Sequence, residues 1–533
     1  MIRVFNTLSR SKEEFRPVES GKVGIYLCGP TVYKPSHIGH MVGPVIFDTI
    51  KRYLTYSGFN VKWVVNITDV DDKLITESNY RGIPMSDVAS EMIDDYKQNL
   101  SAMGVDSIDE FPKATEYIGE IIQFTQDLID KGFAYESEGD VYFEVEKFKE
   151  YGKLSNRTLE QMAGEGGSAA DRKRSTFDFA LWKSAKAGEP SWESPWGNGR
   201  PGWHIECSVM SCALLGETFD IHGGGLDLQF PHHENEVAQS ESRHGKPMAK
   251  YWLHNGLMQA SSEVGKVGGR KTHSANDSEI MAKEGDIVSQ EAGKISKSKG
   301  ASPFRDLLAK IPAETIRFFL VSSHYRRPID FSEERIFDVA RGLETFYRFF
   351  KRFEFVSGET FYSLNAPQTR SEGDQFIESE LLKKAGDFGD QIKMFRNKFL
   401  DSMDDDFNTG GAIGILFEML RGLNKFIETN KLEGSDSKNA VVQEKISQLK
   451  EASQVLKELV LTLGLFRKPL AESSQSNDGN NVLIGQLVQI LIELRLTAKK
   501  NKDFAAADKI RDDLKSLGIT LEDRPGGTAW NRD

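Results

Sequence analysis

The sequence predicts an α/β protein in which a Rossmann-like domain with a parallel sheet carries an inserted domain and is followed by a helical bundle and a small C-terminal α+β module. The first observation is residues 23–66, whose pattern is that of a strand, a loop, a helix and a strand. The second is helical periodicity from Thr315 to Leu465. The third is the end of the chain, where two helical segments precede a hairpin over 519–532.

The first strand–helix–strand unit predicts where a ligand binds. VGIYL at 23–27 and VKWVVN at 61–66 are rich in β-branched and aromatic residues, as buried strands are, and 42–56 has helical spacing. The loop that opens at Gly29 and Pro30 precedes a helix N-terminus, which is a suitable place for phosphate. This unit contains neither G-x-G-x-x-G nor G-x-x-x-x-G-K-[ST], so any nucleotide is held by other residues.

Shifts in composition divide the rest of the chain. GWHIECSVM at 202–210 reads as a strand that returns to the sheet after an insertion. We expect a split Rossmann-like domain at 1–115 and 200–260, an inserted domain at 116–199, a polar insertion with a basic loop at 261–330, a helical bundle at 331–467 and a C-terminal module at 482–533.

Composition favours a cytoplasmic protein. The 68 Lys and Arg against 80 Asp and Glu give a net charge of −12, which leaves nucleic-acid binding to a local basic groove. The N-terminus lacks the apolar core of a signal peptide, and no apolar run reaches the roughly 20 residues of a membrane span. Three cysteines are too few for a disulfide framework, so we expect free thiols in a reducing compartment and no membrane partner.

Two motifs suit the chemistry of a triphosphate. His37 and His40 flank Gly39 at the predicted start of the first helix, where backbone dipoles favour anions. Lys294 and Lys297, in the run KISKS, would stabilise charge that grows on a leaving pyrophosphate. Taken singly, the first motif also fits an ordinary helix start and the second a solvated basic loop.

A third set of residues suits a metal. His232 and Glu236 are four apart, so they share a face if the segment is helical. With Cys28 and Cys207 they offer two thiolates, an imidazole and a carboxylate, a set that zinc accepts. The alternative is a pair of buried cysteines beside a hydrogen-bonded histidine.

The motifs taken together resemble a known family. PSHIGH followed about 250 residues later by KISKS resembles the paired signatures of class I aminoacyl-tRNA synthetases. LCGPTVY, NITDVDDK, DIHGGGLDLQFPHHENE, MDDDFNT and LGITLEDRPGGTAW resemble the cysteinyl-tRNA synthetase family, over nearly the whole chain. The resemblance implies a monomeric ligase that forms cysteinyl-adenylate from L-cysteine and ATP with Mg²⁺, and then transfers cysteine to the 3′ end of tRNA(Cys).

The same resemblance implies roles for individual residues. It places one zinc ion per subunit on Cys28, Cys207, His232 and Glu236, and the catalytic groups on His37, His40, Lys294 and Lys297. Zinc binds thiolate far better than hydroxyl, so it would distinguish cysteine from serine directly. The implied pocket for ATP, adenylate and cysteine comprises Gly29, Thr31, Gly39, Thr68, Trp203, His222, Gly224, Asp227 and Lys297.

The back half of the chain distinguishes this reading from its alternatives. Arg495, Lys499, Lys500 and Lys502 lie within eight residues that contain no acid and fit either a phosphate-binding stripe or a solvated helix face. By resemblance the terminal module reads the anticodon. A paralogous ligase that joins cysteine to an aminosugar would lack this module, and a non-catalytic tRNA-binding homologue would be expected to lose part of the motifs.

Overall fold

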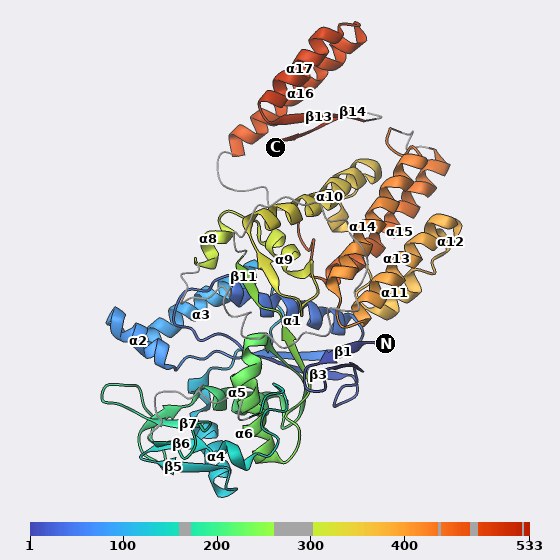
Figure 1. The fold of residues 1–533 in the computed structure, drawn as a ribbon. Helices are drawn as coiled ribbons and strands as arrows, with labels where there is room; N and C mark the ends of the chain where they lie inside the picture. The colour runs from blue at the N-terminus through green and yellow to red at the C-terminus, as the bar shows by residue number, and fades with distance from the viewer. Residues whose placement is uncertain (159–171, 261–301, 435–438, 470–477, 525–526, 533) are drawn as a thin grey trace, which may run out of the picture.

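The structure is a computed structural model that describes residues 1–533 apart from 159–171, 261–301, 435–438, 470–477, 525–526 and 533 (Figure 1). Its central sheet has the strand order β10-β9-β3-β4, and each neighbouring pair is parallel. The strands are β3 (Lys22–Leu27), β4 (Asn60–Val65), β9 (Phe219–Gly225) and β10 (Ala249–Asn255). The predicted parallel-sheet fold is therefore confirmed.

The first helix, α1 (Gly39–Tyr56), makes the crossover from β3 to β4. Its apolar side joins a core that includes Ile25 and Val65 of the sheet, and the same core continues into the helices that follow the sheet. Because all four strands are parallel, their carboxyl ends lie at one edge, where doubly wound sheets bind ligands.

A second sheet lies between β4 and β9 in the chain (Figure 1). It is antiparallel, with the order β5 (Ala134–Ser137), β6 (Asp140–Phe143), β7 (Phe179–Ser184) and β8 (Gly199–Pro201). It follows α2 (Asp72–Arg81), α3 (Met85–Ala102), η1 (Ala114–Tyr117) and α4 (Ile118–Asp130), and η2 (Val145–Lys147) follows β6. Phe124 and Trp182 belong to a second core, which also includes Ile205, Val209 and Ala238 from later segments of the chain.

The predicted strand at 202–210 is wrong, because this segment opens the helix α5 (Trp203–Leu215). Eight consecutive residues, 204–211, are buried in it, so the sequence shows no polar face from which a helical period could be read. Gly202 precedes the helix at a point where a Cβ would lie 1.9 Å from the carbonyl oxygen of Ala180, so only glycine fits. After β9 come η5 (Leu226–Leu228), η6 (Gln229–His233) and α6 (Glu234–His244).

The back half is helical, as predicted. Strands β11 (Met258–Ala260) and β12 (Ile329–Phe331) pair in parallel. The helices are α8 (Phe304–Leu308), α9 (Ala313–Val321), α10 (Glu333–Ser357), η10 (Phe361–Ser363), α11 (Arg370–Phe376), α12 (Glu380–Lys384), α13 (Asp387–Asp404), α14 (Thr409–Thr429) and α15 (Ala440–Thr462).

At the C-terminus α16 (Asp478–Lys500) and α17 (Phe504–Ser516) precede an antiparallel hairpin of β13 (Ile519–Arg524) and β14 (Gly527–Arg532), which confirms the predicted end of the chain. Within the described ranges, no helix combines the length and the apolar character of a membrane span.

The MDDDFNT segment, residues 403–409, forms hydrogen bonds with the N-terminal hairpin. The hairpin of β1 (Arg3–Asn6) and β2 (Ser11–Glu14) lies against it. Asp406 is fully buried and accepts hydrogen bonds from the main-chain nitrogen of Phe5 at 2.7 Å and from Arg326 Nε at 2.8 Å. The Asp406 backbone has a φ of 64°, a left-handed conformation that a non-glycine residue adopts only when its contacts hold it there.

Candidate active site

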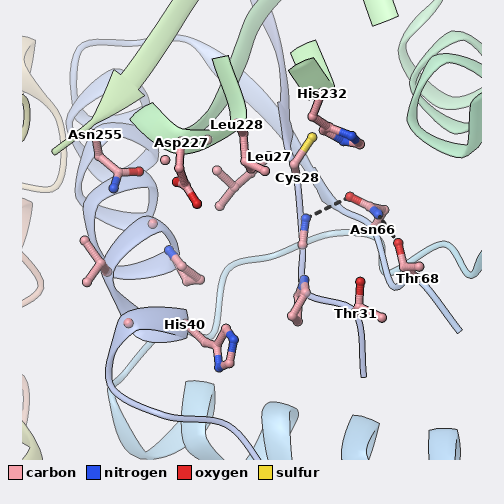
Figure 2. A pocket seen from close by; sticks show the side chains of 18 of the residues that line it. Leu27, Cys28, Thr31, His40, Asn66, Thr68, Asp227, Leu228, His232 and Asn255 are labelled. Atoms are coloured by element: carbon pink, nitrogen blue, oxygen red, sulfur yellow. Dashed lines mark hydrogen bonds between the residues drawn. The ribbon is translucent and has the colours of Figure 1, made fainter. Parts of the chain in front are cut away.

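A cavity of about 570 Å³ opens at the carboxyl ends of the parallel strands (Figure 2). Cys28 and His232 lie together at one side of the cavity, with Asn66 and Thr68 on the same side (Figure 2). His40 lies apart from all four (Figure 2). Of the predicted residues, those that line it are Cys28, Gly29, Thr31, His37, Gly39, His40, Thr68, Trp203, Cys207, Gly224, Asp227 and His232. Lys294 and Lys297 lie outside the described residues.

The four predicted ligands form a compact cluster at one end of the cavity. The Sγ atoms of Cys28 and Cys207 are 3.8 Å apart, and Cys28 Sγ is 3.5 Å from Glu236 Oε1. The same oxygen lies 3.1 Å from His232 Nε2. Zinc bonds of about 2.3 Å to sulfur and about 2.0 Å to nitrogen or oxygen place tetrahedral ligands about 3.3–3.8 Å apart. Two of the three separations, 3.8 and 3.5 Å, lie in this range and the third, 3.1 Å, is slightly shorter, so the donors are close to the spacing of a tetrahedral zinc site. All four donor atoms lie within 4.8 Å of one another.

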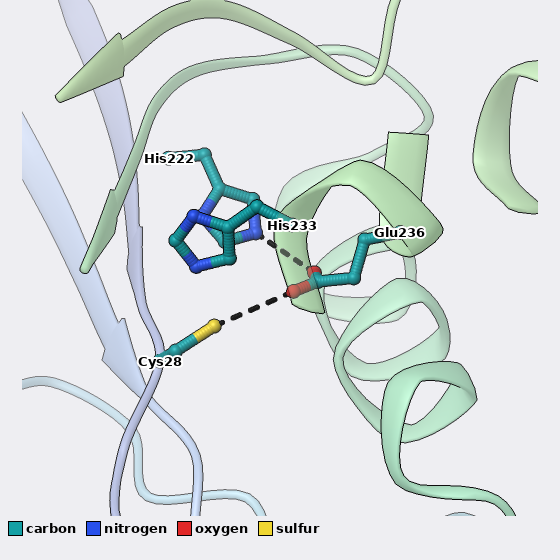
Figure 3. A group of neighbouring side chains, drawn as sticks. All are labelled: Cys28, His222, His233 and Glu236. Carbon is teal, nitrogen blue, oxygen red and sulfur yellow. Dashed lines mark hydrogen bonds and ion pairs between the residues drawn. The ribbon is translucent and has the colours of Figure 1, made fainter. Parts of the chain in front are cut away.

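A second donor group shares two members with the first. Cys28 and Glu236 also lie near His222 and His233, with all four donor atoms within 4.8 Å (Figure 3). His222 Nε2 is 2.8 Å from Glu236 Oε2, and His233 Nδ1 is 2.8 Å from His254 Nε2. The group with two thiols is the better zinc site, because thiolate is the softer ligand. His222 then orients Glu236 from behind, as partners of metal ligands commonly do, and it is fully buried rather than in the cavity lining where it was predicted.

Burial and neighbouring groups shift the pKa values of the two thiols and of the imidazole in the four-donor cluster. Burial, and then the hydrogen bond with Cys207, raise the pKa of the Cys28 thiol well above its usual range. Burial acts the same way on Cys207, but hydrogen bonds from Cys28 and His232 outweigh it and lower the pKa of Cys207 to about 6. Burial is also outweighed at His232, where the Glu236 carboxylate and Cys207 raise the pKa of the imidazole. Cys28 is thus held as a neutral thiol while Cys207 favours its thiolate, and a bound cation would favour the thiolate form of both.

The histidine pair lies at the N-terminus of α1. The main-chain nitrogen of Gly39 donates to His37 Nδ1 at 3.1 Å, and that of His37 donates to His40 Nδ1, also at 3.1 Å. Because Nδ1 is the acceptor in each ring, the single N–H proton of the neutral imidazole lies on Nε2. The two rings lie close together, with centroids 3.8 Å apart and an interplanar angle of 31°. Both imidazoles can therefore donate to an anion at the helix N-terminus.

Residues that the sequence did not single out complete the floor of the cavity. Asn66 Oδ1 accepts from the main-chain nitrogen of Gly29 at 2.8 Å and holds the ends of β3 and β4 together. At Gly29 a Cβ would lie 1.8 Å from the Asn66 carbonyl oxygen, so no other residue fits. Asn66 and Asn255 each lie directly at the carboxyl end of a parallel strand, and that position was the available signal.

The predicted basic stripe on α16 is only partly exposed. Arg495 is buried and forms a bidentate ion pair with Asp523 at 2.6 and 2.8 Å, so it belongs neither to a phosphate-binding stripe nor to a solvated helix face. Lys499 contacts the same carboxylate at 2.7 Å. A second cavity, of about 310 Å³, separates this module from α10. Its lining includes Arg348, Lys351, Phe355 and Trp530.

Known proteins match both the sequence and the fold. The profile described as "tRNA synthetases class I (C) catalytic domain" matches residues 14–266, and the DALR domain matches 398–467. Two solved structures share the fold at 13% identity: a Mycobacterium tuberculosis methionyl-tRNA synthetase (TM-score 0.55, 83% of this chain and 91% of that one) and a putative arginyl-tRNA synthetase from Campylobacter jejuni (TM-score 0.53, 84% and 93%). Fold and site together define a class I aminoacyl-tRNA synthetase.

Curated relatives narrow the class. Cysteine–tRNA ligases from Geobacter metallireducens and Clostridioides difficile are 43% and 40% identical to this chain, over 99% and 100% of its length and the same shares of their own. One from Geobacillus thermodenitrificans is 41% identical over 100% of this chain and 99% of its own. The chain belongs to the cysteine–tRNA ligase family.

Proposed function

We propose that this protein joins L-cysteine to tRNA(Cys) in two steps that use ATP with Mg²⁺. The cysteine carboxylate attacks the α-phosphorus of ATP and releases pyrophosphate, and a hydroxyl of the terminal tRNA ribose then attacks the adenylate carbonyl and releases AMP. The arrangement of the cavity supports this reaction, because a thiol-rich cluster and a helix N-terminus that suits phosphate face one space of about 570 Å³.

Cysteine would be selected at the four-donor cluster. Cys28, Cys207, His232 and Glu236 would hold one zinc ion per subunit, and zinc supplies a strong preference for thiolate over hydroxyl. The spacing of the donors supports this assignment. Trp203 lies over His232 with ring centroids 4.5 Å apart and gives the space beside the cluster an apolar wall.

The phosphates would lie at the other end of the cavity. His37 and His40 donate from Nε2, and Lys294 and Lys297 add positive charge near the pyrophosphate as it leaves. Thr31, Gly39, Gly224 and Asp227 remain our proposed contacts for the nucleotide and the adenylate. This chemistry requires positioning and charge stabilisation and no covalent enzyme intermediate.

The tRNA would extend from the cavity to the C-terminal module at 482–533. Lys500 and Lys502 are exposed on this module, and the cavity between α10 and β14 combines cations with aromatic rings, which bind phosphates and unpaired bases. We also propose the domain boundaries predicted above, a monomeric state and a cytoplasmic location. The three free thiols are consistent with a reducing compartment.

The four-donor cluster, which shares one cavity with the histidine motif, carries the proposal, and a charging assay tests it. The full chain is incubated with labelled cysteine, ATP and Mg²⁺, with unfractionated tRNA in one reaction and an aminosugar acceptor in another. Label on tRNA is expected. Label on the aminosugar alone would move the function to thiol biosynthesis, an alternative that the match of 398–467 to the DALR domain and the full-length relatives make less favourable.

A further inference from the structure

A line of hydrogen bonds runs beneath the cavity floor and ends on a buried carboxyl group, Glu206. The main-chain nitrogen of Gly29 donates to Asn66 Oδ1 at 2.8 Å, and Asn66 Nδ2 makes a longer contact of 3.5 Å with Thr68 Oγ1. Thr68 Oγ1 in turn donates to Glu206 Oε2 at 2.9 Å. The line begins beside Cys28 and ends beside Cys207, so it joins the segments that carry the two thiols.

Glu206 fixes how the Thr68 hydroxyl is used. A threonine hydroxyl has one proton, and here that proton is donated in a hydrogen bond to the Glu206 carboxyl oxygen. The remaining lone pair of Thr68 can only accept, and Thr68 is one of the residues that line the cavity. Burial raises the pKa of Glu206, yet a carboxyl group keeps an oxygen that accepts from Thr68 whether or not it is protonated.

An amino-acid substrate offers the matching group. With its sulfur at the four-donor cluster, the substrate keeps its α-ammonium, which has three donors and no acceptor, near the floor of the cavity. We propose that Glu206 is a positioning residue that turns the Thr68 oxygen toward this ammonium, so that the site selects α-amino thiols over thiols that lack the amine. This inference rests on the proposed function.

The test compares cysteine with 3-mercaptopropionate, which has the same thiol and carboxylate but no ammonium. In ATP–pyrophosphate exchange by the full chain, Glu206→Leu should raise KM for cysteine about tenfold, as expected when a hydrogen bond to a charged group is lost. KM for ATP, zinc content and competitive inhibition by 3-mercaptopropionate should not change. Glu206→Gln keeps an accepting oxygen and should restore KM for cysteine to within about twofold of the wild-type value.

Two further variants separate positioning from general damage. Thr68→Val should raise KM for cysteine by itself, and adding Glu206→Leu to it should cause no further rise, because the two residues act through one contact. Glu241 is a partly buried carboxyl group on α6 that pairs with Lys153. Glu241→Gln is the control and should leave KM for cysteine unchanged.

Three results overturn the inference: an unchanged KM for cysteine in Glu206→Leu, additive effects of the two substitutions, or an equal loss of 3-mercaptopropionate binding. Wild-type protein that fails to activate cysteine would instead refute the proposed function, so the two failures are distinguishable.

Discussion

The main-chain nitrogen of Phe304 donates a hydrogen bond of 2.7 Å to the carbonyl oxygen of Ser36. Both residues are buried. Ser36 directly precedes His37, and Phe304 begins α8, the first described element after the KISKS run. On its other side, Ser36 donates its own main-chain nitrogen to Asp95 Oδ2 at 2.7 Å. The backbone of one residue, Ser36, thus connects α3, the histidine motif and the segment that follows the lysine motif.

This connection predicts a role for Asp95 in nucleotide binding. Asp95→Ala leaves the Ser36 nitrogen without its acceptor and loosens the start of α1, so KM for ATP in pyrophosphate exchange should rise about tenfold. KM for cysteine should stay the same, because the four-donor cluster lies at the other end of the cavity (Figure 2). The neighbouring exposed residue provides the control, and Asp94→Ala should behave as wild type. An Asp95→Ala variant with wild-type KM for ATP would contradict this coupling.

The metal assignment predicts different losses for two thiols on the same helix. Cys207→Ser removes a donor 3.8 Å from Cys28, so zinc content by atomic absorption and cysteine activation should fall together, each by at least about tenfold. Cys212→Ser is the matched control, since Cys212 contacts His244 at 3.7 Å outside the cluster, and it should retain both.

Lys297→Ala separates metal binding from the phosphate chemistry. It should keep its zinc and lose activation, because this residue is assigned to the phosphates. Full zinc content in Cys207→Ser would disprove the donor set, whereas zinc loss in Lys297→Ala would disprove the separation of roles.

Asp406 predicts how the fold responds to acid. Its burial opposes ionisation, but hydrogen bonds from His324 and the Phe5 nitrogen, together with Arg326, hold its pKa below the ordinary 3.8. Since the folded-state pKa is the lower one, the contribution of Asp406 to stability is complete above about pH 4 and is lost as the pH falls further.

Asp406→Asn should therefore lower the midpoint of thermal unfolding at pH 7, with a cost of about 1.5–3 kcal/mol for weakening hydrogen bonds to a buried charged group. The gap between variant and wild type should narrow below pH 4, as followed by circular dichroism. Asp405→Asn, at an exposed neighbour, should change little. A difference in unfolding midpoint that stays constant from pH 7 to pH 3 would show that the charge on Asp406 does not stabilise its contacts with Phe5 and Arg326.

Local pattern and motif predicted much of the fold and the cavity, and contacts between distant elements account for the rest. The strand–helix–strand unit at 23–66 has short apolar strands, and its helix α1 keeps an amphipathic period even though residues 44–51 are all buried, so both patterns are readable. In helix α5 the apolar residues are spread around all sides, so it has no such period. The partner of Arg495 lies 28 residues away on β13, and that of Thr68 lies 138 residues away on α5. Neither spacing carries a signal in a single sequence.

The cavity between α10 and β14 predicts an RNA contact that is separate from catalysis. Lys351 is exposed on α10 and shares this cavity with Trp530 of β14, so a phosphate and an unpaired base could both be held there. Lys351→Ala should raise KM for tRNA several-fold, by about the effect of one phosphate contact, and should lower the dependence of log KM on log salt by about one. Pyrophosphate exchange without tRNA should be unchanged.

Lys384→Ala on α12 is the matched control, because it removes an exposed lysine outside the cavity lining and should leave KM for tRNA as it is. Equal KM values for tRNA in the two variants would mean that this cavity does not contact the RNA. A fall in pyrophosphate exchange in Lys351→Ala would mean that Lys351 affects the catalytic domain and not tRNA binding. In both of these cases, tRNA would have to bind the C-terminal module outside the cavity between α10 and β14.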